Sequence, residues 1–246
     1  MTDQRCRAAG YAILVATFFC LCSISAIADD AAAGSLLSPI GGGSLCVTNG
    51  TVSSLADGRL AIGTASSRGT VRRSDGQRAE IRFRYLGPTA DSKPLASGEL
   101  RRQIGIKLHA QDTCNLLYVM WHIEPDSRIG VSIKSNPGQH THAQCHANGY
   151  TTIRPSGSLA VPRIRPGEAH TLRAELNGSE LVVIADGRPA WVGTVGGGLA
   201  RIVGPVGFRT DNGRFEFEYF ASIAGPGILD QAVDQSRNRC IQQPGD

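Results

Sequence analysis

The stretch from His170 to Phe220 decides the fold: it reads HTLRAELNGSELVVIADGRPAW, a glycine-rich break, and then GPVGFRTDNGRFEFEYF. Three dipeptides within it tolerate the positive φ angles that tight hairpins need. They are Asn177-Gly178, Asp186-Gly187 and Asn212-Gly213. Apolar residues alternate between these turns, which is typical of strands with one buried face. The predicted inward-facing residues are Leu172, Ala174, Leu176, Leu181, Val183, Ala185, Phe215, Phe217 and Tyr219. We therefore predict an antiparallel meander with one buried face.

Further strands are predicted at residues 60–65, 80–86, 103–110, 115–122, 129–134 and 150–153. The segment 115–122 is apolar on both faces, which favours a central strand. No convincing helix is visible. About ten to twelve strands are expected, at the spacing along the sequence that is typical of a sandwich. We predict an all-β fold, an antiparallel two-sheet jelly-roll sandwich over residues 60–224. A flexible leader at 29–59 and a C-terminal tail at 225–246 complete the expected organisation.

The chain of 246 residues has a formal net charge of +4 at pH 7, and 41% of its residues are hydrophobic. The positive charges are spread along the sequence without a basic run, so nucleic-acid binding is not indicated. The sequence also lacks a phosphate-binding loop, a dinucleotide fingerprint and a Ser-His-Asp order. We therefore expect no cofactor, and nothing in the sequence indicates calcium.

Residues 1–28 have the pattern of a secretory signal peptide. Arg5 and Arg7 precede an apolar run from Ala8 to Ile27, and Ala26-Ile27-Ala28 is a small-residue cleavage site. The alternative is a membrane anchor, because a run of about 20 residues is long enough to span a bilayer. The acidic pair that follows Ala28 favours cleavage. We expect a secreted or periplasmic protein without membrane contact after cleavage.

Export changes how the cysteines are interpreted. Three of the seven precede residue 29, and the four that remain are Cys46, Cys114, Cys145 and Cys240. An even number in an oxidising compartment predicts two disulfides, with three possible pairings. We favour Cys114–Cys145, because these residues flank neighbouring strands. Cys46–Cys240 would then join the two ends of the chain.

The stretch from His170 to Phe220 also resembles a known superfamily. A strand, a tight turn, the LVVIADGRPAW hairpin, a loop, and GPVGF before a final strand rich in Phe and Glu follow in that order. This order resembles the second half of a concanavalin A-like jelly roll, of the laminin-G and bacterial glycan-binding kind. The superfamily contains lectins, hydrolases, lyases and adhesion modules, so the resemblance implies a fold and not one activity.

Polar and cationic side chains recur on the predicted outward faces of several strands. They are Arg82, Arg84, Gln103, Lys107, His109, Lys134 and Arg173. If they share one sheet, they form a cationic groove, and a guanidinium group matches a carboxylate or sulfate in bidentate fashion. Such a groove would bind an acidic polysaccharide. The alternative is an ordinary solvated face.

A second resemblance lies within these strands. Arg78-Ala79-Glu80-Ile81-Arg82, with Gln103-Ile104-Gly105 downstream, is similar to the R-x-E-L-R and Q-I-H patterns of jelly-roll alginate lyases. The resemblance implies that Arg78, Arg82 and Gln103 neutralise a uronate carboxylate. Gly105 stands where that family has its proton-transferring His, and the Y-x-K-x-G-x-Y motif is absent. His109 is the nearest substitute.

Two further clusters could carry chemistry. His140, His142 and His146 surround Cys145, and imidazole groups at this spacing can bind zinc or copper. We favour a polar surface loop over a metal site here. Glu216 and Glu218 point the same way from one strand, as paired carboxylates do in jelly-roll glycosidases, but the E-x-D-x-x-E signature is absent.

These features together favour an exported, non-catalytic module that binds a polysaccharide or glycan, and the cationic side chains point to an anionic polysaccharide as the more specific ligand. The first alternative is a polysaccharide lyase that acts on a polyuronate by β-elimination. The second is a structural or adhesion module that binds a protein partner. The lyase needs a His or Tyr close to Arg82 and Gln103, which the sequence alone does not place.

Overall fold

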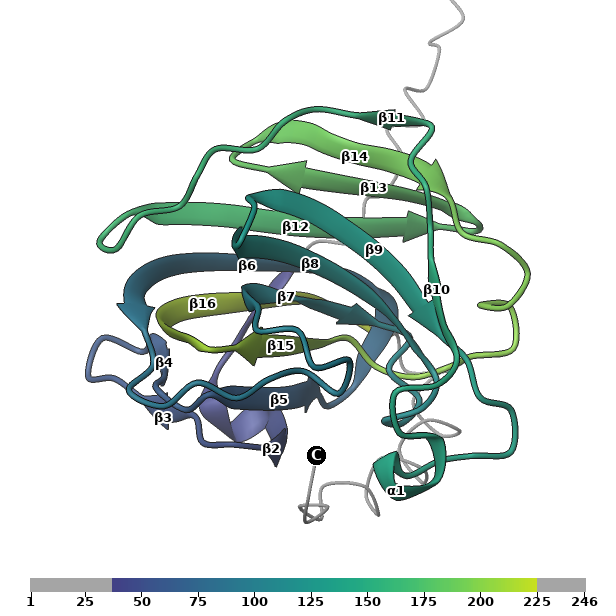
Figure 1. Cartoon of the computed structure of the whole chain (residues 1–246), viewed down its shortest axis with the longest axis horizontal. Helices are drawn as coiled ribbons and strands as arrows, with labels where there is room; N and C mark the ends of the chain where they lie inside the picture. Colours follow the sequence, from purple (N-terminus) through teal and green to yellow (C-terminus); the bar gives the residue numbers. More distant parts are fainter. Residues whose placement is uncertain (1–36, 225–246) are drawn as a thin grey trace, which may run out of the picture. The chain divides into compact units, whose positions relative to one another are not determined.

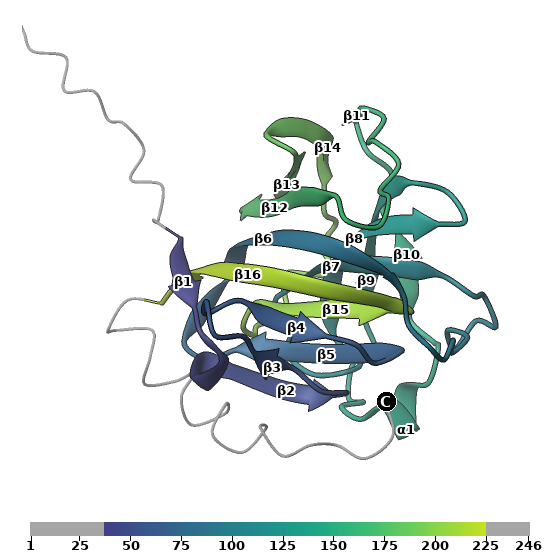
Figure 2. The same cartoon turned by 90° about the vertical axis from the view of Figure 1, so that its left-hand side faces the viewer.

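The computed structural model describes residues 37–224, which fold into two antiparallel β-sheets packed face to face (Figures 1 and 2). This architecture confirms the predicted all-β jelly-roll sandwich. The expected signal peptide, the tail and Cys240 lie outside the described residues. Across residues 37–224, no helix is long and apolar enough to cross a membrane.

The larger sheet has nine strands, with β1 paired to β16 beside the main path. In spatial order the strands of the main path are β11 (Gly157–Ser158), β14 (Arg188–Thr194), β13 (Glu180–Ala185), β12 (Ala169–Asn177), β6 (Ser74–Pro88), β16 (Gly213–Ile223), β4 (Leu60–Ile62) and β3 (Ser53–Ser54). The ninth strand is β1 (Ser38–Ile40). The smaller sheet has seven strands. In order they are β10 (Tyr150–Thr152), β9 (Arg128–Lys134), β8 (Leu116–Glu124), β7 (Arg102–Leu108), β15 (Gly207–Asp211), β5 (Ser66–Val71) and β2 (Leu45–Asn49). The described helical elements are the single turns η1 (Gly42–Ser44) and α1 (His142–Cys145).

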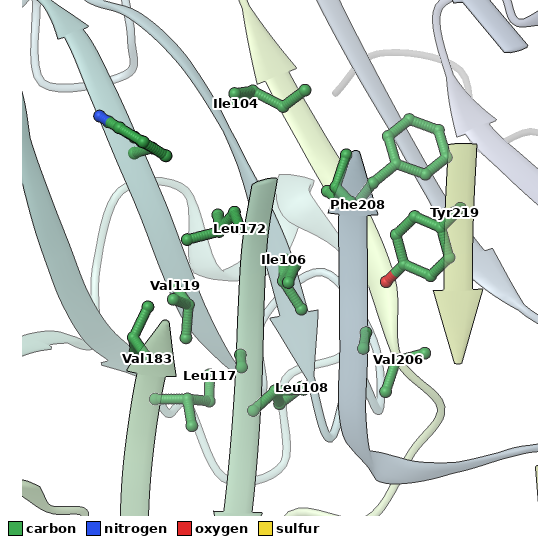
Figure 3. Packing of buried hydrophobic residues seen from close by; sticks show 14 of the residues in the cluster. Ile104, Ile106, Leu108, Leu117, Val119, Leu172, Val183, Val206, Phe208 and Tyr219 are labelled. Carbon is green, nitrogen blue, oxygen red and sulfur yellow. The ribbon is translucent and has the colours of Figure 1, made fainter. Parts of the chain in front are cut away.

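The inward faces of both sheets form one hydrophobic core (Figure 3). Ile104, Ile106 and Leu108 of β7 are buried, as are Leu172 of β12 and Val183 of β13. Each strand contributes every second residue, so alternation in the sequence predicts which side chains are buried. All nine residues predicted to face inward are buried.

The two sheets are also joined by a buried hydrogen bond. The Tyr219 hydroxyl, on β16, donates to the Gly207 carbonyl of β15 at 2.7 Å. Burial raises the pKa of Tyr219, which therefore stays a neutral donor. Trp121 of β8 lies in the same core and packs edge-on against Phe83 of β6, with ring centroids 5.9 Å apart.

Two of the three predicted hairpin turns are confirmed. Asp186 and Gly187 both have positive φ between β13 and β14, and Gly178 has positive φ between β12 and β13. The third prediction is wrong, because Asn212 connects β15 of the smaller sheet to β16 of the larger sheet. Alternation continues through both strands since both sheets bury one face in the same core.

The expected leader at 29–59 is also incorrect from residue 38 onward. Strands β1, β2 and β3 lie within it, and Leu45 and Cys46 of β2 are buried. These strands have two to five residues each, which is too short to show alternation. The sandwich therefore begins before residue 60.

The predicted Cys114–Cys145 disulfide is confirmed, with Cα atoms 5.8 Å apart. It joins the start of β8 to the end of α1 and closes the segment that follows β9. Cys46 is also disulfide-bonded. Its predicted partner, Cys240, lies outside the described residues, so that pairing stays a prediction.

Candidate functional site

The outward face of the seven-stranded sheet carries a dense set of polar side chains, here called the polar face. It consists of Arg68, Gln103, Lys107, Tyr118, His122, Arg209 and Asp211. Antiparallel pairing arranges them in rows across the strands. In one row Asp211 lies opposite Gln103, which lies opposite His122. In the next row Arg209 lies opposite both Arg68 and Gly105.

Asp211 is the centre of a hydrogen-bond network on the polar face. Its Oδ2 accepts from Arg209 Nε at 2.7 Å and from Gln103 Nε2 at 2.6 Å. Its Oδ1 lies 3.4 Å from Arg68 Nη2. Asp211 is 2% exposed and Arg209 is 9% exposed, although both point away from the core. Such a network is rigid, because Asp211 and Arg209 are both removed from water and each needs the other as its charge partner.

The charges of this network fix the protonation state of Asp211. Burial alone would raise the pKa of the Asp211 carboxyl, but Arg209 and Arg68 outweigh it and hold that pKa below its usual range. Asp211 is therefore a carboxylate that accepts hydrogen bonds from both neighbours. This orientation also assigns the Gln103 amide: its nitrogen faces Asp211 and its oxygen points elsewhere.

Two buried atoms beside the network have no hydrogen-bond partner. They are Gln103 Oε1 and His122 Nδ1, on residues directly opposite each other on β7 and β8. Burial, with the charges of Arg101, Arg128 and Arg209, lowers the pKa of His122 to about 3. The imidazole is therefore neutral at physiological pH. Unpartnered buried polar atoms are rare in proteins and mark a place for a ligand or ordered water.

Aromatic rings extend the polar face toward the sheet edge. The Arg209 guanidinium lies over the Tyr118 ring, 5.0 Å from its centroid. The Tyr118 and Tyr150 rings stack at 6.1 Å with an interplanar angle of 20°. Tyr150 is 45% exposed, and desolvation together with Tyr118 raises its pKa. A partly exposed ring beside buried hydrogen-bonding groups is a common composition of a ligand site.

A loop formed by residues 89–101 borders one end of the polar face. The Asn212 side chain holds this loop, since it donates to the carbonyls of Lys93 and Arg101, each at 2.9 Å. It also accepts from the Lys93 amide at 2.7 Å. Arg101 thereby reaches the face, with Nη1 3.4 Å from His122 Nε2.

The other end is bordered by the segment after β9, which contains α1. Lys134 Nζ donates to the carbonyls of Thr113 at 3.0 Å and His146 at 2.8 Å. The Cys114–Cys145 disulfide closes the same segment. Lys134 is 2% exposed and holds the segment in place, so its ammonium group is used structurally.

The larger sheet has a separate pocket of about 520 Å³ on its own outward face. Its lining includes Arg59, Arg82, Arg84, His170, Asp186, Glu216 and Glu218. Arg59 pairs with Glu216 at 2.6 Å, and His170 Nδ1 lies 2.8 Å from Asp186 Oδ2. Three arginines face three carboxylates here, so the pocket has no net charge.

The structure does not bring the predicted cationic residues into one groove. Arg82, Arg84 and Arg173 lie on the larger sheet, where Arg82 pairs with Glu80, and Arg173 with Glu175. Gln103, Lys107 and Lys134 lie on the smaller sheet. Alternation predicted the outward orientation of each residue, but the two outward faces point away from each other across the core.

The lyase-like pattern is divided in the same way. Arg78 and Arg82 are on β6 of the larger sheet, whereas Gln103 is on β7 of the smaller sheet. His109 does not join either face, because β7 ends at Leu108 and His109 has a φ of 47°. Burial lowers the pKa of His109, opposed by a hydrogen bond with the Ile202 backbone and by the charge of Asp75. The residues that the resemblance implies therefore do not form one catalytic centre.

The histidine cluster lies in and around α1. His140 Nδ1 is 2.8 Å from Asp112 Oδ2, and the His142 and His146 rings are 6.2 Å apart. Cys145 is committed to the disulfide. Within residues 37–224, no three His, Cys, Asp or Glu side chains are grouped to hold a metal ion.

Sequence reasoning missed Arg209, Asp211, Tyr118 and His122 as site residues. The signal was present in GFRTD, where Arg209 and Asp211 alternate with apolar Phe208. The composition of β8 predicted a strand buried on both faces, so Tyr118 and His122 fitted its apolar pattern. Strand order, which brings β15 beside β7, was the missing information.

The chain matches no family model, and no curated protein matches it. Among solved structures it is similar to carbohydrate-binding module CBM66 from Bacillus subtilis, with 12% identity over 71% of this chain and 91% of that chain and a TM-score of 0.50. It also matches domain 4 of AbnA, an extracellular arabinanase from Geobacillus stearothermophilus, with 12% identity over 76% of this chain and 86% of that chain and a TM-score of 0.41. The first similarity concerns the fold alone, a sandwich of two β-sheets.

Proposed function

We propose that this chain is an exported, non-catalytic glycan-binding module whose ligand lies on the polar face. The observation that carries the proposal is the unpartnered buried pair, Gln103 Oε1 and His122 Nδ1, on the same sheet face as the partly exposed Tyr150. Sugars combine hydroxyl groups, which need planar donors and acceptors, with apolar ring faces, which pack on aromatic side chains. The polar face offers both.

The fold is compatible with this proposal. The similar structure from Bacillus subtilis is a carbohydrate-binding module. Because a fold hosts many functions, this similarity is an analogy, and the argument depends on the polar face itself. Export is consistent with the Cys114–Cys145 disulfide, since such bonds persist in oxidising compartments.

The charge near the polar face favours an anionic polysaccharide. Among the described residues, Arg68, Arg101 and Arg209 pair with only two carboxylates, Asp211 and Glu99, which leaves an excess of one positive charge. Arg128 adds a further positive charge close enough to lower the pKa of His122. We therefore expect retention on acidic polymers to weaken as salt is added, because ions screen exposed charges.

A polyuronate lyase is the second candidate, because Gln103, His122 and Tyr118 share one face. A lyase needs a base with a pKa near the working pH. The pKa of His122 is lowered to about 3, so this imidazole is a weak base, and the pKa of Tyr150 is raised, so its hydroxyl does not ionise readily. These shifts favour binding without turnover.

The test uses the purified protein and a panel of neutral and acidic polysaccharides that includes polyuronates. Retention on each polymer is measured together with the ultraviolet absorbance of unsaturated sugar ends. We expect retention on at least one acidic polymer and no rise in absorbance. A rise would establish the lyase instead. Absence of retention on every polymer would contradict the glycan proposal and favour a structural or adhesion module with a protein partner.

A further inference from the structure

One row of the polar face crosses four strands. Arg128 of β9 lies opposite His122 of β8, which lies opposite Gln103 of β7, which lies opposite Asp211 of β15. Residues directly opposite each other on one face have Cβ atoms only about 5 Å apart. Neighbouring members of this row therefore lie close enough for adjacent groups of one ligand to reach both of them.

The hydrogen-bonding character of two members can be assigned. An arginine only donates, so the contact with Arg101 Nη1 makes His122 Nε2 the acceptor. A neutral imidazole then carries its proton on Nδ1, which is an unpartnered donor. Gln103 Nε2 donates to Asp211, which leaves Gln103 Oε1 as an unpartnered acceptor.

A donor on His122 and an acceptor on Gln103, carried by residues opposite each other on β8 and β7, select the chemistry of a shared partner. A hydroxyl group both accepts and donates, so it satisfies His122 Nδ1 and Gln103 Oε1 together. A carboxylate accepts only, and its charge would be repelled by Gln103 Oε1. These two residues are therefore suited to a hydroxyl and unsuited to an acidic group.

Arg128 supplies the charged group of the row. It is exposed, and no ion-pair partner is found for it within residues 37–224. A guanidinium group without a carboxylate partner is a preferred ligand for carboxylates and sulfates.

We infer that Arg128, His122 and Gln103 form one subsite that recognises an acidic group and a neighbouring hydroxyl on the same sugar unit of an acidic glycan. The inference rests on the proposed function and adds the class of sugar. Arg128 binds the acidic group, and the His122–Gln103 pair binds the hydroxyl.

The experiment is calorimetric titration of the purified protein with oligogalacturonate, with oligomannuronate, and with the same oligomers after reduction of their carboxyl groups to alcohols. Arg128→Gln should weaken binding of an acidic oligomer about tenfold, the usual effect of one charged hydrogen bond, and leave binding of its reduced form unchanged. Gln103→Leu and His122→Phe should weaken binding of both forms by about three- to tenfold. Arg188→Gln, an exposed arginine on β14 of the other sheet, is the matched control and should change neither.

The outcomes separate the subsite from the proposed function. Equal loss for both forms with Arg128→Gln, or no loss with any of the three variants, would overturn the subsite while glycan binding stands. Retention of the protein on neutral polymers alone would also overturn the subsite. If the wild-type protein binds no oligomer and no polymer, the proposed function fails and the subsite fails with it. Arg128 is exposed, so its variant gives a decision even if a buried variant does not fold.

Discussion

Asp211 accepts a hydrogen bond from Arg209 Nε at 2.7 Å on an outward sheet face where both side chains are almost fully buried. A buried ion pair is not required for stability, because well-packed apolar residues at the same positions often stabilise a fold at least as much. It does hold the surrounding donors and acceptors in fixed positions. The pair is thus the rigid base on which the Gln103 amide is oriented.

Neutralising Asp211 should strongly destabilise the fold. Asp211→Asn leaves Arg209 buried without its counter-ion, and breaking one partner of a buried pair costs about 3–5 kcal/mol. The free energy of unfolding, measured by urea denaturation, should fall by that amount. Glu216→Gln is the matched control, because its pair with Arg59 is partly exposed and contributes about 1 kcal/mol or less. Equal losses for the two variants would contradict the importance of the buried pair.

Acid should remove the same stabilisation. The pKa of Asp211 is lower in the folded chain than in the unfolded chain, where it is about 3.9. Its contribution is therefore fully present above the unfolded value and is lost as pH falls through the folded value. Between pH 5 and pH 2, the wild-type melting temperature should fall more steeply than that of Asp211→Asn. Parallel curves for the two proteins would contradict this expectation.

Adding a side chain at Gly105 should disrupt the polar face. A Cβ there would lie 2.3 Å from the Val119 carbonyl oxygen and 2.8 Å from the Met120 Cα, so the backbone would have to shift. Gly105→Ala should lower the free energy of unfolding by about 1–3 kcal/mol. Gly196→Ala is the control, because a Cβ at Gly196 meets no atom within 4 Å. A neutral effect at Gly105 would mean that β7 and β8 are more widely spaced than described. The same crowding means that Gly105→His cannot simply restore a lyase pattern.

The exposed ring of Tyr150 should contribute to glycan affinity. Tyr150→Ala removes an aromatic surface at the edge of the polar face and should reduce affinity for a retained polymer by about three- to tenfold. Affinity electrophoresis in gels that contain the polymer measures this change. Leu159→Ala, which removes an exposed apolar side chain elsewhere, should leave migration unchanged. Unaltered migration of Tyr150→Ala would place the ligand away from β10.

The Cys114–Cys145 bond should stabilise the chain mainly through its unfolded state. The two residues are 31 positions apart, and closing a loop of this length contributes about 3–4 kcal/mol. The double variant Cys114→Ala/Cys145→Ala keeps other cysteines intact, and its melting temperature should fall markedly. A melting temperature close to wild type would indicate that Lys134 and its neighbours hold the segment without the disulfide.

Much of the sandwich could be predicted from local patterns. Two-residue alternation identified the buried residues of β12, β13 and β16, and the Asp186-Gly187 turn was located because few residues other than glycine adopt positive φ easily. The same logic failed at Asn212, where the turn connects two sheets. Alternation shows which side of a strand is buried, and it contains no information about which sheet the strand joins.

The candidate site depended on that missing information. Arg82 and Gln103 were both predicted to face outward and do so, but they belong to opposite sheets. Arg209 and His122 come together because β15 pairs with β7 across a long separation in sequence. Long-range pairing is fixed by the packing of the whole core, so a local reading of either strand could not bring these side chains together.

The attachment of loop 89–101 at Asn212 has a consequence for how such a protein can diversify. The Asn212 side chain, in the connection between the sheets, holds the loop. The loop places Arg101 Nη1 3.4 Å from His122 Nε2 on the polar face. Exchanging the residues between Pro88 and Arg102 therefore alters what approaches His122 without altering any strand of the core. A library randomised in that segment, with Asn212 retained, is a practical route to sandwiches of this type with new sugar preferences.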